Sequence, residues 1–351
     1  MTVSNQDTLA RNLRIALVHR SGSEDWTWLL GRCRYADQLD VRSVRIPPFA
    51  ADRGIGQVPA SMMAAERVWS EHQSEPFDLI LSHLPGCAAW IELMRRGRKG
   101  RHDLFAFNFT TIPTGPRRWQ MNGAFRRLHQ SFTLTEVERH LYAESFGMDP
   151  SRITVVPWGV TPPTVGAERL IDGSYIASLG GEARDYAPLI EAAAQLPDEK
   201  FVIVARPQNL AGLALPANVT TMVNIPGPDA WNIVDNADMH ILSLQNSETP
   251  CGIVTVVGAM HLGKPQVMTA APGVLEYAPE GEASIGVPGG SAEAIVQAIQ
   301  QLRSHPEQAA RMGAAARTRA AERFSEEMTK NFVDSYLRTI ADDPTGFVPA
   351  P

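Results

Sequence analysis

The chain has 351 residues, 44% of them hydrophobic and 20% charged, which is typical of a globular protein long enough for two domains. Its 32 Lys and Arg against 38 Asp and Glu give a net charge of −6, too small to indicate a nucleic acid or membrane partner. Three scattered cysteines exclude a disulfide framework and a cysteine zinc site, and no apolar run reaches the ~18 residues that span a bilayer. We therefore expect a cytoplasmic protein with reduced thiols.

In the first half of the chain, short β-branched runs alternate with helical stretches, the pattern of a parallel sheet covered by helices on both faces. Strands are expected at 13–18, 77–82, 105–109, 131–135 and 153–156, and helices at 62–72 and 136–146. Pro157, Pro162, Pro163 and Gly166 then follow within ten residues. Such a density of proline and glycine marks an exposed connection, so we place a domain boundary there.

The same alternation restarts after this connection. Strands are expected at 174–179, 201–204, 219–223, 239–244, 265–269 and 284–287, and helices at 187–195, at about 253–262, after the capping residue Ser291 and twice after Pro306. In the last helix Met328, Phe332, Tyr336 and Ile340 recur every four residues, which predicts a packing face. The sequence thus predicts an α/β protein of two doubly wound, Rossmann-like domains that bind ligands beyond the carboxyl ends of their strands.

Positive charge is concentrated between Ile91 and Gln130. This segment holds nine Arg and Lys against two acids, so it carries +7 in a chain of −6. Such a segment suits an anionic membrane, an anionic acceptor or a phosphate-bearing substrate, or is simply a solvated helix end and loop. Peripheral membrane contact through residues 95–127 follows as a prediction.

Residues 243–265 are the most informative segment. A strand ends there, a loop presents Glu248, and Gly252 opens a helix. The free N–H groups at that helix start, around Gly252, Ile253 and Val254, form a cradle for a diphosphate, and a glycine lets the phosphate approach the backbone. Glu248, just ahead of the cradle, is placed to accept hydrogen bonds from sugar or ribose hydroxyls.

The passages after residue 130 form a recognisable series. They are Phe146-Gly147 with 155–160, 178–181 followed by Arg184, Ala237-Asp238, the Glu248 loop, 259–265, Pro272-Gly273 with Glu276-Tyr277, and 312–325. Together they resemble the retaining GT-B glycosyltransferases of the family 4, or group 1, type. The resemblance is specific over 130–340 and only architectural over 1–129.

The resemblance implies a GT-B fold of two facing Rossmann-like domains. Residues 1–160 would bind the acceptor, residues 161–325 the nucleotide-sugar donor, and residues 326–351 would form a helix and tail that cross back onto the N-terminal domain. The implied reaction is retaining transfer of a hexose from a nucleoside diphosphate sugar to a glycan, lipid-linked or small-molecule acceptor, in polysaccharide or glycoconjugate biosynthesis. It would take place in the cytoplasm, peripherally at the inner membrane face.

The resemblance implies no cofactor and no essential metal, and the sequence shows no set of side chains with metal-ligand spacing. Nucleic acid is not an expected partner, because aromatic residues are too sparse along the basic segment.

The donor roles fall on a few residues. Gly180 and Gly181 match the glycine loop of the family, and Arg184 matches its basic contact to the diphosphate. The alternative for Arg184 is a surface ion pair with Glu182 or Asp185.

The remaining assignments are less direct. Glu248 matches the first of two paired glutamates and would contact the transferred sugar, or else act as a helix N-cap. Asn224 and Ile225 follow the strand where relatives place the nucleotide base. On the acceptor side the candidates are Asn108, at a loop where many relatives have a histidine, and His83, which is alternatively a buried structural residue.

The chain also departs from the family. Gly258 stands where relatives have the second glutamate, and the sequence has no arginine adjoining Gly181. These departures leave two alternatives: a catalytically silent homologue that binds nucleotide sugars or serves as a partner subunit, and a GT-B sugar-nucleotide epimerase.

Overall fold

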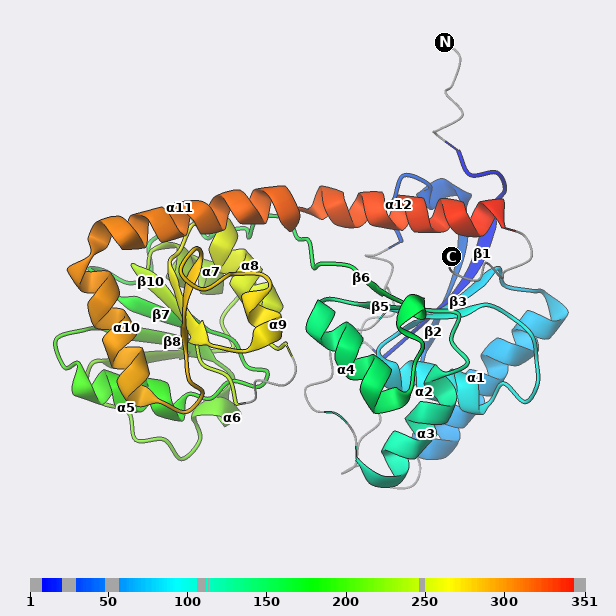
Figure 1. Ribbon diagram of the computed structural model, residues 1–351, viewed down its shortest axis with the longest axis horizontal. Helices are drawn as coiled ribbons and strands as arrows, with labels where there is room; N and C mark the ends of the chain where they lie inside the picture. The colour runs from blue at the N-terminus through cyan, green and yellow to red at the C-terminus, as the bar shows by residue number, and fades with distance from the viewer. Residues whose placement is uncertain are drawn as a thin grey trace, which may run out of the picture. The chain divides into compact units, whose positions relative to one another are not determined.

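The computed structural model describes residues 8–20, 30–47, 57–105, 112, 114–245 and 250–343. The chain divides into two compact units (Figure 1): unit 1 is Met1–Pro157 with Glu327–Pro351, and unit 2 is Trp158–Glu326. Within the described ranges each unit is built on a six-stranded parallel sheet. The predicted fold class, with its two Rossmann-like domains and its returning C-terminal helix, is confirmed.

Unit 1 has the strand order β2-β1-β3-β4-β5-β6. The strands are β1 Leu13–His19, β2 Leu39–Arg45, β3 Leu79–His83, β4 His102–Phe105, β5 Gln130–Thr133 and β6 Ile153–Val155. The helices are α1 Gln57–Ser74, α2 Pro85–Leu93, α3 Gly115–Phe125, α4 Glu136–Phe146 and the C-terminal α12 Glu326–Asp342, with short 3-10 turns at Ala36–Gln38 and Pro150–Arg152.

Both faces of this sheet are covered, because its central strands are apolar on both sides. One cluster joins β1 and β3 to α1 and α2 around the fully buried Trp69. Another joins the opposite faces of β1 and β3 to α12 through Val333, Leu337 and Ile340. The C-terminal helix is therefore part of the core of unit 1.

The packing face of α12 is displaced from the one predicted. Met328 is 42% exposed, whereas Val333 and Leu337 are buried. Phe332 and Tyr336 flank the buried face, and each meets Phe132 of β5 edge-on, at 5.2 and 4.9 Å between ring centroids. The four-residue interval drifts around a helix of 3.6 residues per turn, which explains the offset.

Unit 2 has the strand order β12-β11-β10-β7-β8-β9. The strands are β7 Ile176–Leu179, β8 Phe201–Ala205, β9 Val219–Val223, β10 Met239–Leu242, β11 Gln266–Thr269 and β12 Ser284–Val287. The helices are α5 Ala187–Gln195, α6 Pro207–Leu210, α7 Gly227–Asp235, α8 Ile253–His261, α9 Pro272–Leu275, α10 Ala292–Ser304 and α11 Pro306–Arg323.

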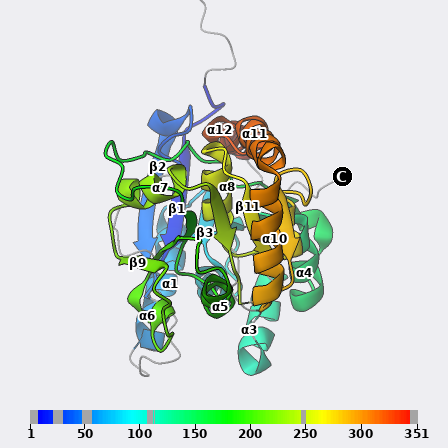
Figure 2. The ribbon, with the colours of Figure 1, turned by 90° about the vertical axis from the view of Figure 1, so that its left-hand side faces the viewer.

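Two layers of helices enclose the sheet of unit 2. On one face α5 and α10 lie side by side (Figures 1 and 2) and pack against alternate residues of β7, β8 and β10. On the other face α7 and α8 pack against the intervening residues of β7 and β8. Ser291 caps α10 as predicted, since its side chain accepts a hydrogen bond from the N–H of Ala294.

Three elements of unit 1 are not predicted from the sequence: β2, α2 and α3. The edge strand β2 is half-exposed and polar, so it lacks a clear apolar run. Helix α2 is buried almost all round, so it lacks an amphipathic period. The strand expected at 105–109 is β4, which occupies His102–Phe105 instead, and residues 106–109 lie outside the described ranges.

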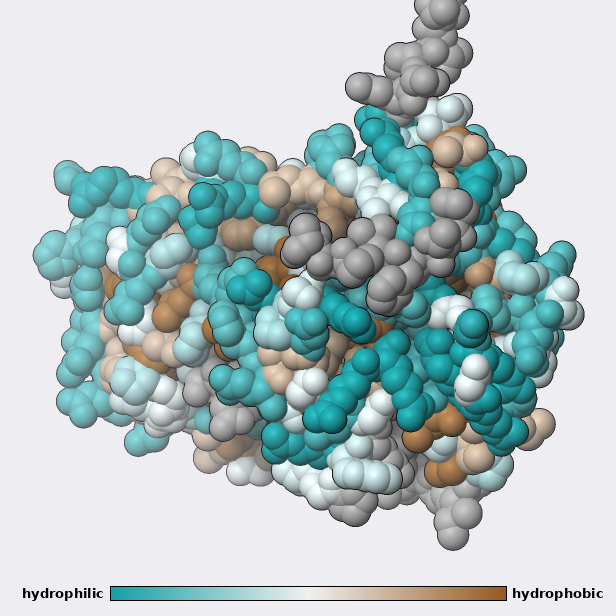
Figure 3. All heavy atoms as spheres, turned by 45° about the vertical axis from the view of Figure 1, so that its right-hand side comes forward, coloured by the Kyte–Doolittle hydropathy of each residue, from teal (hydrophilic) through white to brown (hydrophobic). Residues whose placement is uncertain are grey.

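No described helix combines the length and the apolar character needed to cross a membrane. On the face drawn in Figure 3, hydrophilic side chains predominate and apolar residues occur in small groups.

Candidate donor and acceptor sites

Helix α8 begins as the sequence predicts. Gly252 is its N-cap, in the left-handed conformation with φ of 86°, which a glycine adopts without strain. The first intrahelical bond runs from the N–H of Val256 to the carbonyl of Gly252 at 2.9 Å. The N–H groups of Ile253 and Val254 precede it and are the groups that an anion accepts from.

Arg184 lies against this helix start. A Cβ atom on Gly252 would stand 3.0 Å from Nη1 of Arg184, and one on Gly180 would stand 2.7 Å from its Nε and Cζ. Gly180, just beyond β7, has φ of 133°. An added Cβ would force the guanidinium to shift at Gly180 and would crowd it at Gly252, and the positive φ of both residues also favours glycine. The structure thus brings together three of the predicted donor residues.

The Arg184 guanidinium is buried and held by neutral acceptors. The residue is 4% exposed, and it donates to the carbonyls of Leu179 and Glu182 at 3.3 and 2.9 Å and to Oγ1 of Thr255 at 3.0 Å. Among the residues that the structure describes, no carboxylate lies within ion-pair distance of it. The surface ion pair with Glu182 or Asp185 is thus replaced by a contact with the backbone of Glu182.

Two loops at the carboxyl edge of the sheet hold Arg184 in place. The N–H of Asp185 donates to the carbonyl of Ser243, and the N–H of Gln245 donates to the carbonyl of Ala183, both at 3.0 Å. Ala183 has φ of 52°, an uncommon value for a residue with a side chain. The loop after β7 is in this way joined to the end of β10, beside residues 246–249, which lie outside the described ranges.

Arg206 adds a second cation to the glycine loop. It directly follows β8, and a Cβ atom on Gly181 would stand 2.7 Å from its Cδ and Nε. Its Nη1 lies 3.4 Å from Oε2 of Glu182, and both side chains are more than half exposed. The sequence offers no arginine next to Gly181 along the chain. The pairing of β7 with β8 instead brings Arg206, which follows the neighbouring strand, to Gly181.

The other predicted donor residues are placed less closely. Asn224 is exposed and left-handed, with φ of 52°, at the carboxyl end of β9, and Ile225 follows it half-buried. They share the carboxyl edge of the sheet with Arg184, two strands away. Glu248 lies outside the described residues, as does Asn108 on the acceptor side.

In unit 1, His83 ends β3 and is 6% exposed. Burial, and then the charge of His19, lowers the pKa of His83 to about 3. His19 ends the neighbouring strand β1, is fully buried, and bonds Oγ of Ser43 through Nε2 at 2.8 Å. At neutral pH His83 is an uncharged and weak base, so its location favours the structural alternative over proton transfer.

The turn after β3 is strained. Leu84 has φ of 82°, a conformation that a bulky side chain avoids, and it immediately precedes α2. A Cβ atom on Gly86, in the first turn of α2, would stand 3.3 Å from Nη1 of Arg20. The carboxyl edge of unit 1 thus combines backbone strain, a helix start and a cation, features common at binding sites.

Two family models match the chain. The model described as Glycosyltransferase Family 4 matches residues 13–162, and the model described as Glycosyl transferases group 1 matches residues 177–319. The chain is a GT-B glycosyltransferase of this family.

Solved structures of low identity share the fold of the glycosyltransferase. Sucrose-phosphate synthase from Thermosynechococcus elongatus is 17% identical with a TM-score of 0.76, covering 94% of this chain and 100% of that one. HepE from Anabaena in complex with UDP is 15% identical with a TM-score of 0.71, covering 93% and 100%. WaaG, a glycosyltransferase involved in lipopolysaccharide biosynthesis, is 13% identical with a TM-score of 0.65, covering 92% and 99%. The comparison with curated proteins gives no match.

An aromatic ring lies against Gly258, the residue that the sequence resemblance aligns with the second family glutamate. Gly258 is buried in α8, and a Cβ atom there would stand 2.7 and 2.8 Å from Cζ3 and Cζ2 of Trp231 on α7. Real Cβ contacts are essentially never that short. A glutamate at 258 would therefore have to displace the indole, which packs in the core between α7 and α8.

Much of the basic segment is neutralised within unit 1. Arg95 lies 2.6 Å from Glu92, Arg98 pairs with Glu66, and Arg101 lies 2.9 Å from Asp103. The side chains of these three arginines are only 12 to 16% exposed. The +7 of the sequence therefore overstates the positive charge that reaches the surface.

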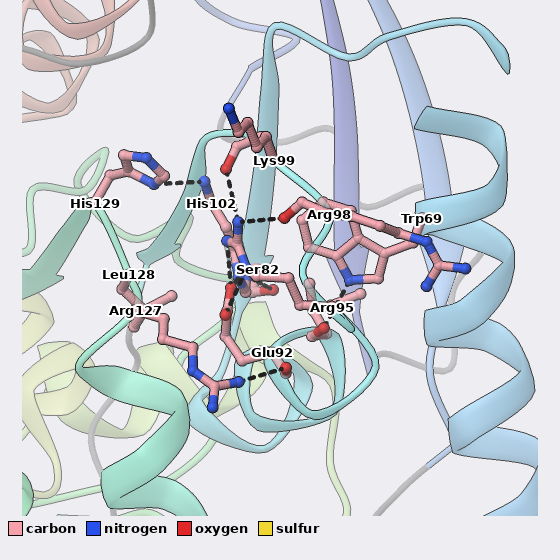
Figure 4. Close-up of polar contacts among 12 residues, drawn as sticks. Trp69, Ser82, Glu92, Arg95, Arg98, Lys99, His102, Arg127, Leu128 and His129 are labelled. Atoms are coloured by element: carbon pink, nitrogen blue, oxygen red, sulfur yellow. Dashed lines mark hydrogen bonds and ion pairs between the residues drawn. The ribbon is translucent and has the colours of Figure 1, made fainter. Parts of the chain in front are cut away.

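The Glu92 ion pair extends into a buried network (Figure 4). Oγ of Ser82 is hydrogen-bonded to Nε2 of His102 at 2.7 Å, and Nδ1 of His102 to Oε1 of Glu92 at 2.6 Å. The order is that of a hydrolytic triad, but Ser82, His102 and Glu92 are all 0% exposed. Since no substrate reaches a fully buried hydroxyl, the network serves to fasten α2 and the loop after it to β3 and β4.

Glu92 is the anionic centre of that network. Burial by itself raises the pKa of Glu92, but hydrogen bonds and charges from His102 and then Arg95 outweigh it and lower the pKa to about 2. The carboxylate thus stays ionised throughout the physiological range.

Two further features bear on the site. No group of three His, Cys, Asp or Glu side chains in the described ranges is arranged to hold a metal ion. A cavity of about 330 Å³ in unit 2 is lined by Asp238, Pro265 and Arg303 among others, at the amino ends of β10 and β11. It is at the opposite sheet edge from Arg184, away from where parallel sheets bind ligands.

The first prediction concerns Gly258. Gly258→Ala is expected to destabilise the enzyme by about 1–3 kcal/mol, because overpacking against Trp231 outweighs the higher helix propensity of alanine. In a Trp231→Leu background the same alanine should stabilise. Urea unfolding of the four proteins of this cycle measures both effects. Gly123→Ala in α3, where no atom lies within 4 Å of the added methyl, is the control and should stabilise by about 0.5–1 kcal/mol. A stabilising Gly258→Ala in the wild-type background would contradict the steric argument.

The second prediction concerns His83. The pKa of His83 in the folded protein, about 3, lies below the ordinary histidine value of 6.5, so the unfolded chain binds a proton between these pH values that the folded chain does not. The stability that His83 contributes is therefore present above pH 6.5 and is lost as the pH falls toward 3. Wild type should lose more stability than His83→Gln between pH 7.5 and pH 5, as measured by urea unfolding at both. Substitution of the exposed His305 by glutamine is the control. Equal losses in wild type and His83→Gln would refute the prediction.

Proposed function

We propose that this glycosyltransferase transfers a hexose from a nucleoside diphosphate sugar, with retention of configuration and without an essential metal. The acceptor would be a glycan, a lipid-linked glycan or a small molecule, in polysaccharide or glycoconjugate biosynthesis. The observation that carries the proposal is Arg184, a buried cation held only by neutral acceptors among the described residues, against the start of α8 and two glycines. A buried charge without a counter-charge is costly, so an anion at this point would be strongly favoured.

A diphosphate is the anion that this arrangement suits. The guanidinium, which lies against Gly180 and Gly252, and the first N–H groups of α8 offer hydrogen-bond donors to a phosphate from two groups of the chain. HepE, which shares the fold, was solved with UDP and with UDP-glucose. Glu248 would then orient the transferred sugar, and Asn224 and Ile225 would adjoin the base.

The proposed reaction breaks the bond between the sugar C1 and the diphosphate oxygen and forms a bond from an acceptor oxygen to C1. The electron pair of the broken bond stays with the diphosphate. The proton of the acceptor hydroxyl passes to a leaving diphosphate oxygen on the same face of the sugar. Arg184 and the α8 start stabilise the charge that develops on the leaving group, which is where fixed donors accelerate a reaction most.

Unit 1 would meet an anionic acceptor or membrane surface through its remaining exposed cations. Arg96, whose side chain is 61% exposed, and the exposed Arg126 and Arg127 are not among the low-exposure ion pairs. Trp119, on the helix α3 that ends at the C-cap Arg126, is 78% exposed, and an exposed indole is a frequent membrane-surface contact. We therefore propose peripheral membrane contact through these residues.

The third prediction tests the donor site. Calorimetry with UDP, GDP, ADP and their hexose conjugates should show binding of one nucleotide type. Arg184→Ala should weaken that binding by roughly 10- to 100-fold, as expected for losing hydrogen bonds to a charged group worth about 1.5–3 kcal/mol. Arg311→Ala, at a 73% exposed side chain on α11, is the control and should bind like wild type.

Turnover separates the alternatives. Release of nucleoside diphosphate that requires an acceptor indicates transfer. Isomerisation of the donor without an acceptor would indicate an epimerase, and nucleotide binding without any turnover would indicate a silent partner subunit. Absence of binding by every nucleotide would overturn the donor site.

The fourth prediction tests the membrane contact. The double variant Trp119→Ala, Arg126→Glu should lose sedimentation with phosphatidylglycerol vesicles, whereas Arg311→Glu should retain it. Neither wild type nor the variants should sediment with phosphatidylcholine vesicles, because the attraction is electrostatic. If wild type does not sediment with phosphatidylglycerol vesicles, or the double variant sediments equally, membrane contact through this surface is excluded.

A further inference from the structure

Each glycine of the loop after β7 lies against one arginine. Gly180 adjoins the guanidinium of Arg184, and Gly181 adjoins the side-chain stem and Nε of Arg206. The two arginines come from different places, one from the loop itself and one from the end of the neighbouring strand β8. The carbonyl of Gly181 accepts from Nδ2 of Asn209 at 2.9 Å, which fixes the orientation of the loop beneath Arg206.

The two arginines differ in what neutralises them. Arg184 is buried and bonded to carbonyls and a hydroxyl. Arg206 is 55% exposed at its side chain, and the carboxylate near it is that of Glu182, 64% exposed, at 3.4 Å. An exposed pair at that distance contributes little to folding. The Glu182 carboxylate therefore holds Arg206 only weakly, and a stronger anion can compete with it for this guanidinium.

We infer that Arg206 is a second phosphate-binding cation of the donor site, and that Glu182 occupies it until a diphosphate takes the place of the carboxylate. The inference rests on the proposed function, because it assigns a further residue to the same site. It makes Arg206 a ligand contact and Glu182 a competitor of the ligand.

Charge arithmetic supports this exchange. Arg184 and Arg206 carry two positive charges around two consecutive glycines, and Glu182 offsets one of them. A diphosphate carries enough negative charge to neutralise both and has oxygens on two phosphorus atoms to reach both. Burial lowers the pKa of Arg184, nearby groups including Glu182 raise it, and Arg206 lowers it further, so the two cations are close enough to repel each other. An anion between them relieves that repulsion.

The fifth prediction uses substitutions of opposite effect. Arg206→Gln should weaken binding of the preferred nucleotide among UDP, GDP and ADP by about tenfold, whereas Glu182→Gln should tighten it by about two- to fivefold, magnitudes typical of one charge-assisted contact. The effect of Arg206→Gln should shrink with the corresponding monophosphate and disappear with the nucleoside. Added salt should weaken binding less in Arg206→Gln than in wild type.

The matched control is the pair Arg311–Glu307 on α11, which is also exposed and long, at 3.8 Å. Arg311→Gln and Glu307→Gln should leave nucleotide affinity unchanged. If the Arg206–Glu182 pair merely held the loop, both of its variants would weaken binding together.

Three outcomes overturn the inference. The first is weaker binding in both Arg206→Gln and Glu182→Gln. The second is an affinity within twofold of wild type in both variants while Arg184→Ala still loses binding. Either result removes Arg206 from the site and leaves the donor site standing. No binding of UDP, GDP, ADP or inorganic pyrophosphate to wild type overturns the donor site together with Arg206.

Discussion

The burial of one guanidinium governs the local structure of unit 2. Arg184 can be buried because backbone carbonyls and Thr255 accept its hydrogen bonds, and those acceptors exist only if the loop after β7 and the start of α8 stay close together. Gly180 and Gly252 make that approach possible, since a side chain at either would collide with the arginine. The same geometry leaves a positive centre beside free helix N–H groups, so the structural role and the proposed binding role have one origin.

The arginine–glycine contacts of unit 2 and the strained turn and terminal histidines of unit 1 each lie at the carboxyl edge of a parallel sheet. In unit 2 the loops after β7, β8 and β10 meet there, which brings Arg184 and Arg206 to adjacent glycines. In unit 1 the strained Leu84 and the two histidines that end β1 and β3 lie at the corresponding edge. Strands in register end side by side, so residues far apart in sequence become neighbours at that edge.

Formal charge along the sequence is a poor guide to charge at the surface. Arg95, Arg98 and Arg101 account for a third of the nine cations of the basic segment, yet each is held by a carboxylate in or near the core of unit 1. Burial makes these pairs part of the fold, and the Ser82–His102–Glu92 network extends the pairing into the sheet. What remains for a partner is the smaller group of exposed cations of unit 1, among them Arg96 and Arg126.

The sequence by itself predicted two doubly wound domains and the helix start at Gly252, because strand periodicity and helix starts are local patterns, and the resemblance of its motifs indicated the GT-B family and the candidates Gly180 and Arg184. It did not determine the burial of His83, the indole of Trp231 against Gly258 or the contact of Arg206 with Gly181. Each of these depends on which strands and helices lie side by side, and side-chain contacts between elements are decided only when the tertiary structure packs them together.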